Sequence, residues 1–358
     1  MKKILFVALA ATLLAAGCQK TELINRVGDK IDFSTEMGKL TKADGDDVDE
    51  LATLKAQDFQ VWVYTAYTDK LNNVEPGAIY DGMSGLEISD NTSGTWGPTN
   101  ATDYYWPGKE NNLEFYGIST GFDIVTDKPE KDGDPAVNTV ITPGANRNIV
   151  ITGYTVTPTT ATDDLMIADF VTQNQTSDNN SRKVTMNFRH ALSKVTFAFN
   201  TTGDKTVKVS KLEVTDLVVN GVLTASEDKT ATATATATAT TTPITLSWNT
   251  KPEGFVEDTD DFTRTFEEAK QTLATGDHVP FTTWLVVPQA LEGKTVKIWY
   301  SIGDKEFTHI FSLASTSLPN GWEVNQSVTY KVSLSPNTIT FDATVSPWEE
   351  DIPVTEVN

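Results

Sequence analysis

Cysteine is almost absent from this chain of 358 residues, since Cys18 is the only one. An intramolecular disulfide is therefore excluded, and the folded state has to rely on buried apolar area. Histidine is nearly as scarce, with His190, His278 and His309 widely separated in the sequence. None of them stands in a His-Glu-x-x-His zinc motif. The sequence therefore predicts no metal site and no cofactor.

Positive charge is also in short supply: 28 Lys and Arg residues face 49 Asp and Glu residues, a formal net charge of −21 at pH 7. A chain this acidic is repelled by the phosphates of nucleic acids and by anionic membrane surfaces, which excludes nucleic acid as a partner. The densest acidic cluster, residues 44–50, has its glycine at the second position rather than the sixth, so it is no EF-hand loop. We interpret it as a solvated loop that leads into a short helix over residues 46–58.

Catalytic motifs are nearly absent as well. Residues 117–121 match the Gly-x-Ser-x-Gly pattern, with Ser119 at its centre. A nucleophile of this type needs a strand-to-helix turn, whereas strand-like sequence continues over residues 122–125 and a loop follows. We interpret the match as coincidental. The sequence predicts no catalytic residue and a protein that is not an enzyme.

The N-terminus has a short positive start, and an apolar run follows over residues 4–14. The run is too short for a membrane span of about 20 helical residues. Small residues lead from it directly into Cys18, and this layout predicts a secretory signal peptide over residues 1–17.

The Ala-Ala-Gly-Cys step that ends at Cys18 resembles a bacterial lipobox. The resemblance implies cleavage before Cys18 and attachment of lipid, palmitate included, to its sulfur and to the new amino end. Cys18 would then anchor the protein in outer-membrane lipid. An ordinary signal peptide with a chance cysteine is the alternative.

The rest of the chain is rich in period-two alternation, with apolar residues on one face and polar residues on the other. It recurs over residues 59–65, 113–118, 183–188, 194–199 and 296–302. Clusters of Gly, Pro, Asn and Asp separate these segments. Apart from residues 46–58, only residues 262–273 carry a helical spacing. The pattern predicts an all-β protein built from β-sandwiches.

A run of polar residues over 173–181 suggests a boundary between two domains. We expect a lipidated leader over residues 18–42, an N-terminal β-sandwich over 43–178 and a C-terminal one over 179–358. The Ala-Thr run over residues 230–242 has no large side chain to anchor it in a core. We interpret it as a mobile hairpin extension or loop, with a glycosylated stalk as the alternative.

The tryptophans make a binding function a second possibility. Trp96, Trp106, Trp322 and Trp348 stand in turn-rich sequence and could present rings to a sugar. A surface-anchored lipoprotein that binds a host or bacterial glycan or protein receptor is therefore the alternative to a structural role.

Several short motifs, each weak alone, occur in a fixed order along the chain. They are residues 31–35, 41–43, 59–62, 104–107, 113–116, 164–168 and 184–195. Together with the lipobox, this ordered set resembles the fimbrillin-like family, the lipoprotein precursors of type V pili. The resemblance implies two tandem transthyretin-like β-sandwich domains and a structural, adhesive role in a fimbria. It also implies other fimbrial subunits as partners and export to the cell surface as an outer-membrane lipoprotein.

The same resemblance implies assembly by strand exchange. A trypsin-like protease would cut after Lys42 or Lys39, and the first strand would leave with the lipid. The empty groove would then accept a C-terminal strand of the next subunit. A cut at Arg26, before the strand, would leave the groove filled. Whether the chain is a shaft, anchor or tip subunit is left open.

Two segments have the alternation that such an exchange needs. The removable strand would bury Ile31, Phe33, Thr35 and Met37. A C-terminal donor could replace them with Ile339, Phe341, Ala343 and Val345. Alternatively, residues 339–345 are the last strand of the second domain and the tail with Ile352 and Val354 is the donor. Pro347 and Trp348 would then form the hinge, because proline cannot continue a β-ladder.

Overall fold

A computed structural model describes most of the chain downstream of residue 28. The described residues are 29–37, 58–70, 73–90, 96–108, 111–119, 138–157, 164–175, 183–202, 204–235, 239–251, 259–265, 271–336 and 339–348. Several predictions lie outside them: the signal peptide, the acidic cluster over residues 44–50, Cys18, Lys39, Lys42, Ile352 and Val354. Of the predicted helix over residues 46–58, only Asp58 is described, and it precedes the first residue of a strand.

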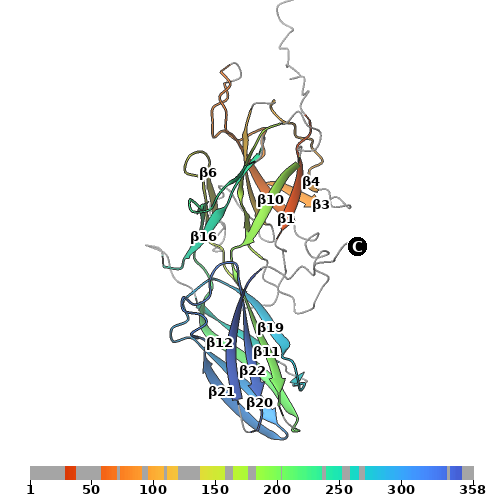
Figure 1. The fold of residues 1–358 in the computed structure, drawn as a ribbon, viewed down its shortest axis with the longest axis vertical. Helices are drawn as coiled ribbons and strands as arrows, with labels where there is room; N and C mark the ends of the chain where they lie inside the picture. Colours follow the sequence, from red (N-terminus) through yellow and green to blue (C-terminus); the bar gives the residue numbers. More distant parts are fainter. Residues whose placement is uncertain are drawn as a thin grey trace, which may run out of the picture.

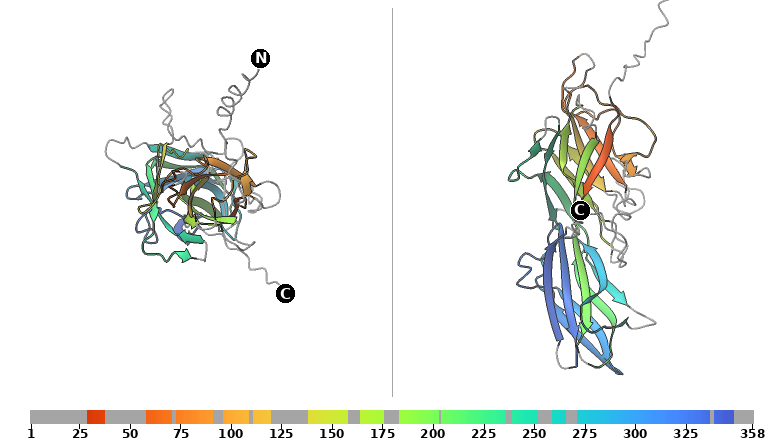
Figure 2. Two further views of the ribbon diagram at one scale, coloured as in Figure 1. Left: turned by 90° about the horizontal axis from the view of Figure 1, so that it is seen from above. Right: turned by 45° about the vertical axis from the view of Figure 1, so that its right-hand side comes forward.

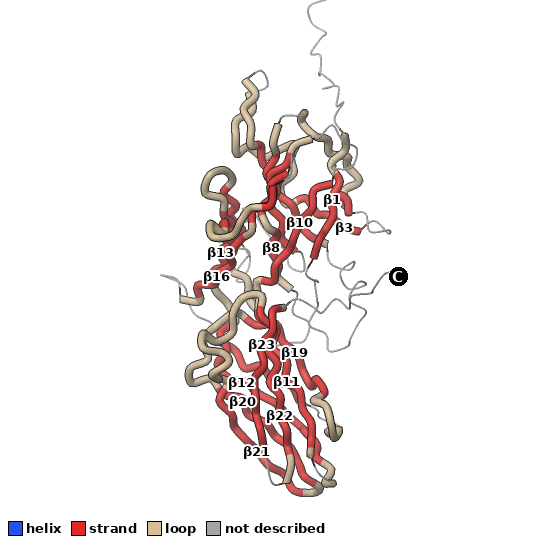
Figure 3. Tube along the Cα trace, in the orientation of Figure 1, coloured by secondary structure: helices blue, strands red, loops and turns tan. Residues whose placement is uncertain are grey.

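The all-β class is confirmed, because β-strands are the only extended regular structure in the described part of the chain (Figure 3). The molecule is elongated, with an upper and a lower lobe joined end to end (Figure 1). Two sheets form each lobe. The chain first passes from the upper to the lower lobe where β10 gives way to β11 (Figure 2, right). It returns to the upper lobe between β12 and β13 and passes down again between β16 and β17.

The upper lobe contains a ten-stranded sheet and a four-stranded sheet. In spatial order, the ten strands are β14 (Thr234–Ala235), β15 (Ala239–Thr242), β9 (Phe170–Gln173), β5 (Leu113–Ser119), β2 (Phe59–Thr65), β3 (Leu86–Asp90), β4 (Trp96–Pro98), β1 (Asp32–Met37), β10 (Lys183–His190) and β8 (Met166–Ala168). The four strands are β16 (Ile244–Asn249), β13 (Val222–Glu227), β7 (Asn148–Thr152) and β6 (Asn138–Thr142).

The lower lobe is formed by a four-stranded and a five-stranded sheet. The four strands are β19 (Val279–Val286), β11 (Ser193–Thr201), β22 (Gln326–Leu334) and β23 (Ile339–Pro347). The five are β17 (Thr259–Thr265), β12 (Val207–Val218), β20 (Thr295–Ile302) and β21 (Lys305–Ser312), with β18 (Gln271–Thr272) beside β12.

The upper sheet curls back on itself. β5 pairs with β2 along its whole length and also meets β8 at Ile118 and Ile167. Seven strands, β2-β3-β4-β1-β10-β8-β5, therefore form a closed ring around an apolar interior. Every residue of β5 is buried, because one face of the strand points into the ring and the other packs towards β7 and β13. A fully buried strand of this kind positions both cores of the upper lobe.

Gly117 of β5 is where the ring is packed most closely. A Cβ atom at this position would lie 2.7 Å from Met186 Cε and 3.1 Å from Ala168 Cβ. Both partners point inward from β10 and β8. Glycine here lets three strands approach each other, which is a structural reason for one residue of the Gly-x-Ser-x-Gly match.

The predicted helix over residues 262–273 is wrong. Residues 259–265 form β17, which pairs with β12, and residues 271–272 form β18. Phe262 is buried between the exposed Asp261 and half-buried Thr263, so the period-two alternation applies. Pairing with a neighbouring strand outweighed the weak helical spacing.

The hydrogen-bonded sheets cross the expected domain boundary at residues 178 and 179. β10, β13 and β15 follow that point in the chain but pair with β1, β7 and β9, which precede it. The boundary itself stays a prediction. The Ala-Thr run contributes β14 and β15, a hairpin that extends the upper sheet beside β9.

Candidate functional site

The candidate site is the place that β1 occupies in the ring. β1 lies parallel to β10, with paired residues from Asp32 and Lys183 to Met37 and Phe188. On its other edge it meets β4, where Phe33 pairs with Trp96 (Figure 1). β1 is therefore an interior strand with partners on both edges, although it is the first described strand of the chain.

Backbone hydrogen bonds hold the segment just before β1. The N–H of Ile31 donates to the carbonyl of Tyr104 at 2.8 Å. The carbonyl of Asp29 accepts from the N–H of Trp106 at 3.1 Å. The predicted motif over residues 104–107 thus lies beside the first strand and completes its pairing.

The inward side chains of β1 and its approach are buried in the ring. Ile31 and Phe33 are each 1% exposed. The Phe33 ring meets those of Phe59 and Phe115 edge to face, with centroids 6.2 Å away in both cases. Full burial of such a side chain contributes about 1.5–3 kcal/mol. Thr35 and Met37 belong to β1, but their side chains lie outside the described part of the structure.

Polar contacts add little to the retention of β1. Ser34 Oγ lies 3.0 Å from Thr185 Oγ1 on β10. Lys30 Nζ lies 2.7 Å from Asp103, and this hydrogen bond raises the pKa of the Lys30 ammonium. Both partners of that ion pair are about half exposed, so its contribution is small. Apolar burial and strand pairing are the main attachments.

The first donor candidate forms the last strand of the lower lobe. β23 pairs with β22 over nine residues, from Ile339 with Leu334 to Pro347 with Gln326. Phe341 stacks on Phe311 and Tyr330, with centroids at 4.6 and 5.1 Å. The opposite edge of β23 has no strand partner among the described residues.

The inward face of β23 is only partly covered. Ile339, Phe341 and Ala343 are half-buried against the core, whereas Val345 is 39% exposed. Residues 339–345 lie in the last described strand, as in the alternative in which they are the last strand of the second domain. Their use as a donor stays a prediction, as does that of Ile352 and Val354.

The four tryptophans expected in exposed turns are all buried: Trp96, Trp106, Trp322 and Trp348. That expectation is wrong, because the tryptophans in these turn-rich segments pack over the ends of the hydrophobic cores. Trp96 and Trp106 cover the phenylalanines of the ring, and the Trp322 N–H donates to the Tyr330 hydroxyl. These rings therefore form no exposed sugar platform.

Ser119 is also fully buried. Its hydroxyl donates to the carbonyl of Asp164 and accepts from the N–H of Met166, both at 2.8 Å. The side chain thus ties β5 to the start of β8. His190 Nδ1 lies 2.6 Å from Asp164 Oδ2, while His278 and His309 lie on the lower lobe.

Two features are absent from the described residues: a cluster that could hold a metal ion and a helix that could span a membrane. Their His, Cys, Asp and Glu side chains form no group of three that could hold a metal ion. They also include no helix with the length and apolar character needed to span a membrane.

Comparison with known proteins identifies the family of this chain. The sequence matches the family described as fimbrillin-like over residues 41–348. The chain belongs to the fimbrillin-like family. Family membership indicates a fimbrial protein of the cell surface that associates with other fimbrial subunits, and it suggests a non-enzymatic role.

This fimbrillin-like chain also has matches among solved structures. A fimbrial protein from Bacteroides vulgatus is 17% identical, with a TM-score of 0.46, and the match covers 89% of this chain and 100% of that one. A fimbrial assembly protein from Parabacteroides distasonis is 13% identical, with a TM-score of 0.36, covering 89% of this chain and 99% of that one. The comparison with curated proteins found no match.

Proposed function

We propose that the chain is a structural subunit of a type V fimbria, polymerised by removal of the first strand and strand exchange. The observation that carries this proposal is the position of β1 inside the closed ring. Removal of an edge strand would leave a sheet intact, whereas removal of β1 opens the ring between β4 and β10.

Loss of β1 would create a site that only another strand can fill. The edge of β10 would lose its partner over six residues, and the backbone groups of Tyr104 and Trp106 would lose theirs. The faces that hold Ile31 and Phe33 would become an apolar slot. Added strands satisfy such edges through backbone hydrogen bonds and gain specificity from alternate side-chain pockets.

The proposed cleavage sites follow β1 directly. Lys39 and Lys42 stand after Met37, so a cut at either would separate the strand from everything downstream of it. The strand would then be held by non-covalent contacts alone. Lipid on Cys18 would stay with the released piece, which is how a polymerising subunit would leave the outer membrane.

The structure favours the tail over β23 as the donor. Withdrawal of β23 would break a nine-residue ladder with β22 and unstack Phe341 from its two neighbours. A donor segment with Ile352 and Val354 would leave that ladder intact. We further propose that the two lobes are the transthyretin-like sandwiches that the sequence resemblance implies.

The N-terminal residue of the protein recovered from the cell surface tests this proposal. A polymerised subunit should begin at Leu40 or Ala43, because the cut follows Lys39 or Lys42. A surface protein that still begins at a lipidated Cys18 would retain β1. It would then be an anchor or accessory lipoprotein, and the polymerising role would be wrong.

A further inference from the structure

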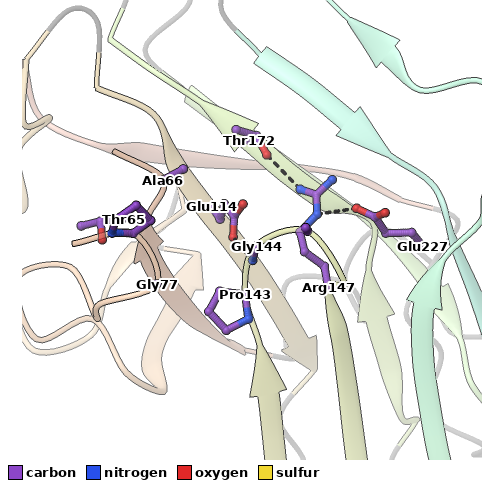
Figure 4. A pocket seen from close by; sticks show the side chains of 11 residues that line it. Thr65, Ala66, Gly77, Glu114, Pro143, Gly144, Arg147, Thr172 and Glu227 are labelled. Atoms are coloured by element: carbon purple, nitrogen blue, oxygen red, sulfur yellow. Dashed lines mark hydrogen bonds and ion pairs between the residues drawn. The ribbon is translucent and has the colours of Figure 1, made fainter. Parts of the chain in front are cut away.

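A polar hollow lies on the upper lobe, away from the slot of β1. Its volume is about 450 Å³, within the range of about 300–1,000 Å³ that small-molecule sites occupy. Thr65 and Gly77 lie on one side, Arg147 and Glu227 on the other, with Glu114 and Gly144 between them (Figure 4). We call it the Glu114 pocket. No residue of β1 or β23 lines it.

Glu114 gives the pocket an acceptor that the protein does not saturate. Its side chain is 8% exposed, and its Oε2 accepts from the Tyr116 hydroxyl at 2.9 Å and from the Gly144 N–H at 3.0 Å. Oε1 accepts no hydrogen bond from the described residues. A hydrogen bond donated by a ligand to the second oxygen would stabilise a carboxylate that is buried to this extent.

Two contacts fix the orientation of that carboxylate. Burial and the neighbouring Glu114 raise the pKa of the Tyr116 phenol, so Tyr116 stays a hydrogen-bond donor at neutral pH. The Gly144 N–H comes from the turn between β6 and β7. Oε1 is therefore held in one direction before any ligand arrives.

Arg147 supplies donors on the side of the pocket that faces Thr65 and Gly77. Its Nε donates to Glu227 at 2.5 Å, and its terminal nitrogens donate to Thr172 and Thr242, each at 2.9 Å. The guanidinium also lies 5.8 Å from the Phe170 ring centroid, which limits its rotation. A guanidinium has five N–H groups, so Arg147 has two more than these three hydrogen bonds use.

The chemistry of the walls selects one class of ligand. Two carboxylates and one guanidinium line the pocket of a chain whose net charge is −21, so an anionic ligand is disfavoured. Acceptors and donors that line the same pocket suit hydroxyl groups, which both donate and accept. Pro76, Pro143, Ala66 and Ala145 offer apolar surface for ring C–H groups.

We propose that the Glu114 pocket binds a neutral sugar residue, free or at the end of a glycan. Glu114 Oε1 accepts from one hydroxyl, and the guanidinium of Arg147 donates to another. The site is independent of strand exchange, because it shares no residue with the β1 slot. A subunit that carries it presents a sugar-binding site with its first strand either present or replaced.

The test measures sugar binding to the full mature chain by saturation-transfer NMR and calorimetry. The probes are glucose, galactose, mannose and N-acetylglucosamine, their methyl glycosides, oligosaccharides that end in each sugar, and sialic acid. We expect saturable binding of at least one neutral sugar, and of the oligosaccharide that ends in it, without binding of sialic acid. Binding of the free sugar alone would indicate a monosaccharide ligand rather than a glycan end.

Two variants link binding to the pocket. Glu114→Gln keeps an acceptor for Tyr116 and Gly144 but places an amide donor where Oε1 accepts, so affinity should fall about tenfold or more. Ala145→Trp should block the pocket by bulk while leaving Glu114 untouched. The matched controls Glu292→Gln and Ala314→Trp are on distant turns of the lower lobe and should bind as the parent does. Melting curves show which variants fold.

The proposal is overturned if no neutral sugar binds at tens of millimolar. It is also overturned if sialic acid binds best, or if folded Glu114→Gln and Ala145→Trp proteins bind as the parent does. Failure of strand exchange would not affect any of these outcomes, so the two proposals are tested separately.

Discussion

The indole of Trp348 lies flat on the imidazole of His190, with ring centroids 3.8 Å apart and planes inclined by 5°. Trp348 immediately follows β23 of the lower lobe, whereas His190 ends β10 of the upper lobe. The imidazole of His190 is held by its hydrogen bond with the carboxylate of Asp164. The backbone N–H of Trp348 donates to the backbone carbonyl of Asn325 at 3.0 Å. The predicted hinge residue is thus a buried contact that fastens the end of β23 to the other lobe.

This stack predicts a large loss of stability for Trp348→Ala. Truncation of a buried tryptophan costs about 3–5 kcal/mol, since it removes apolar burial and leaves a cavity. Urea unfolding of the uncut protein measures the effect. Trp299→Ala is the matched control, because the Trp299 ring lies on the outer face between Lys211 and Lys297. Its removal should lower the free energy of unfolding by about 1 kcal/mol. Equal effects of the two variants would contradict the fastening role.

Phe33→Asp should loosen β1 in the uncut protein. The new carboxylate would be buried among Phe59 and Phe115 without a partner, at a cost of several kcal/mol. Hydrogen exchange of the β10 amides should accelerate, because these groups pair with β1. Ser34→Ala, which removes one contact to Thr185, should change exchange far less. Unchanged protection in Phe33→Asp would show that β1 does not depend on this side chain.

Gly117→Ala tests the close packing of the ring. The added methyl group would meet Met186, Ala168 and Phe188 at 2.7–3.2 Å, so we expect a destabilisation of about 1–3 kcal/mol. Shortening the nearest neighbour should relieve part of the clash. In a double-mutant cycle of unfolding free energies, Gly117→Ala and Met186→Ala should therefore cost less together than the sum of the two. Strict additivity would argue against the contact.

The lipid anchor gives a chemical prediction. Cys18→Ala should abolish labelling by radioactive palmitate and leave the precursor uncleaved or released from the membrane, because no other cysteine can supply the sulfur. Detergent partitioning of the variant measures the release. The substitutions Thr21→Ser and Thr21→Ala serve as controls and should leave labelling intact. An unchanged membrane fraction for Cys18→Ala would remove the anchor from the account.

The strands were the part of the fold that the sequence predicted best. All five alternating segments became strands: β2, β5, β10, β11 and β20. Alternation is a local pattern of residue types, so it can be read without knowing the partner strand. It did not show that β5 is buried on both faces. The same local reading failed for residues 262–273, where pairing with β12 decided the structure.

Pairing and site geometry could not be predicted in the same way. The ring depends on β5 reaching β8, a contact between Ile118 and Ile167 that no short motif encodes. The Glu114 pocket joins residues from six separated segments of the chain. The stack of Trp348 on His190 joins the two ends of the second half of the chain. Only the isolated charged residues among strand-like sequence, such as Glu114 within residues 113–119, could have pointed to the pocket.

The central claim is that β1 can be exchanged for a strand of another subunit, and laddering after cleavage tests it most directly. Purified protein is cut with limiting trypsin, with the Lys39→Gln, Lys42→Gln double variant as an uncut control, and run unboiled on a denaturing gel. The account predicts ladders for the cut protein, none for the control, and loss of ladders when residues 352–358 are deleted. A cut protein that stays monomeric at high concentration and binds no peptide spanning residues 339–358 would contradict it.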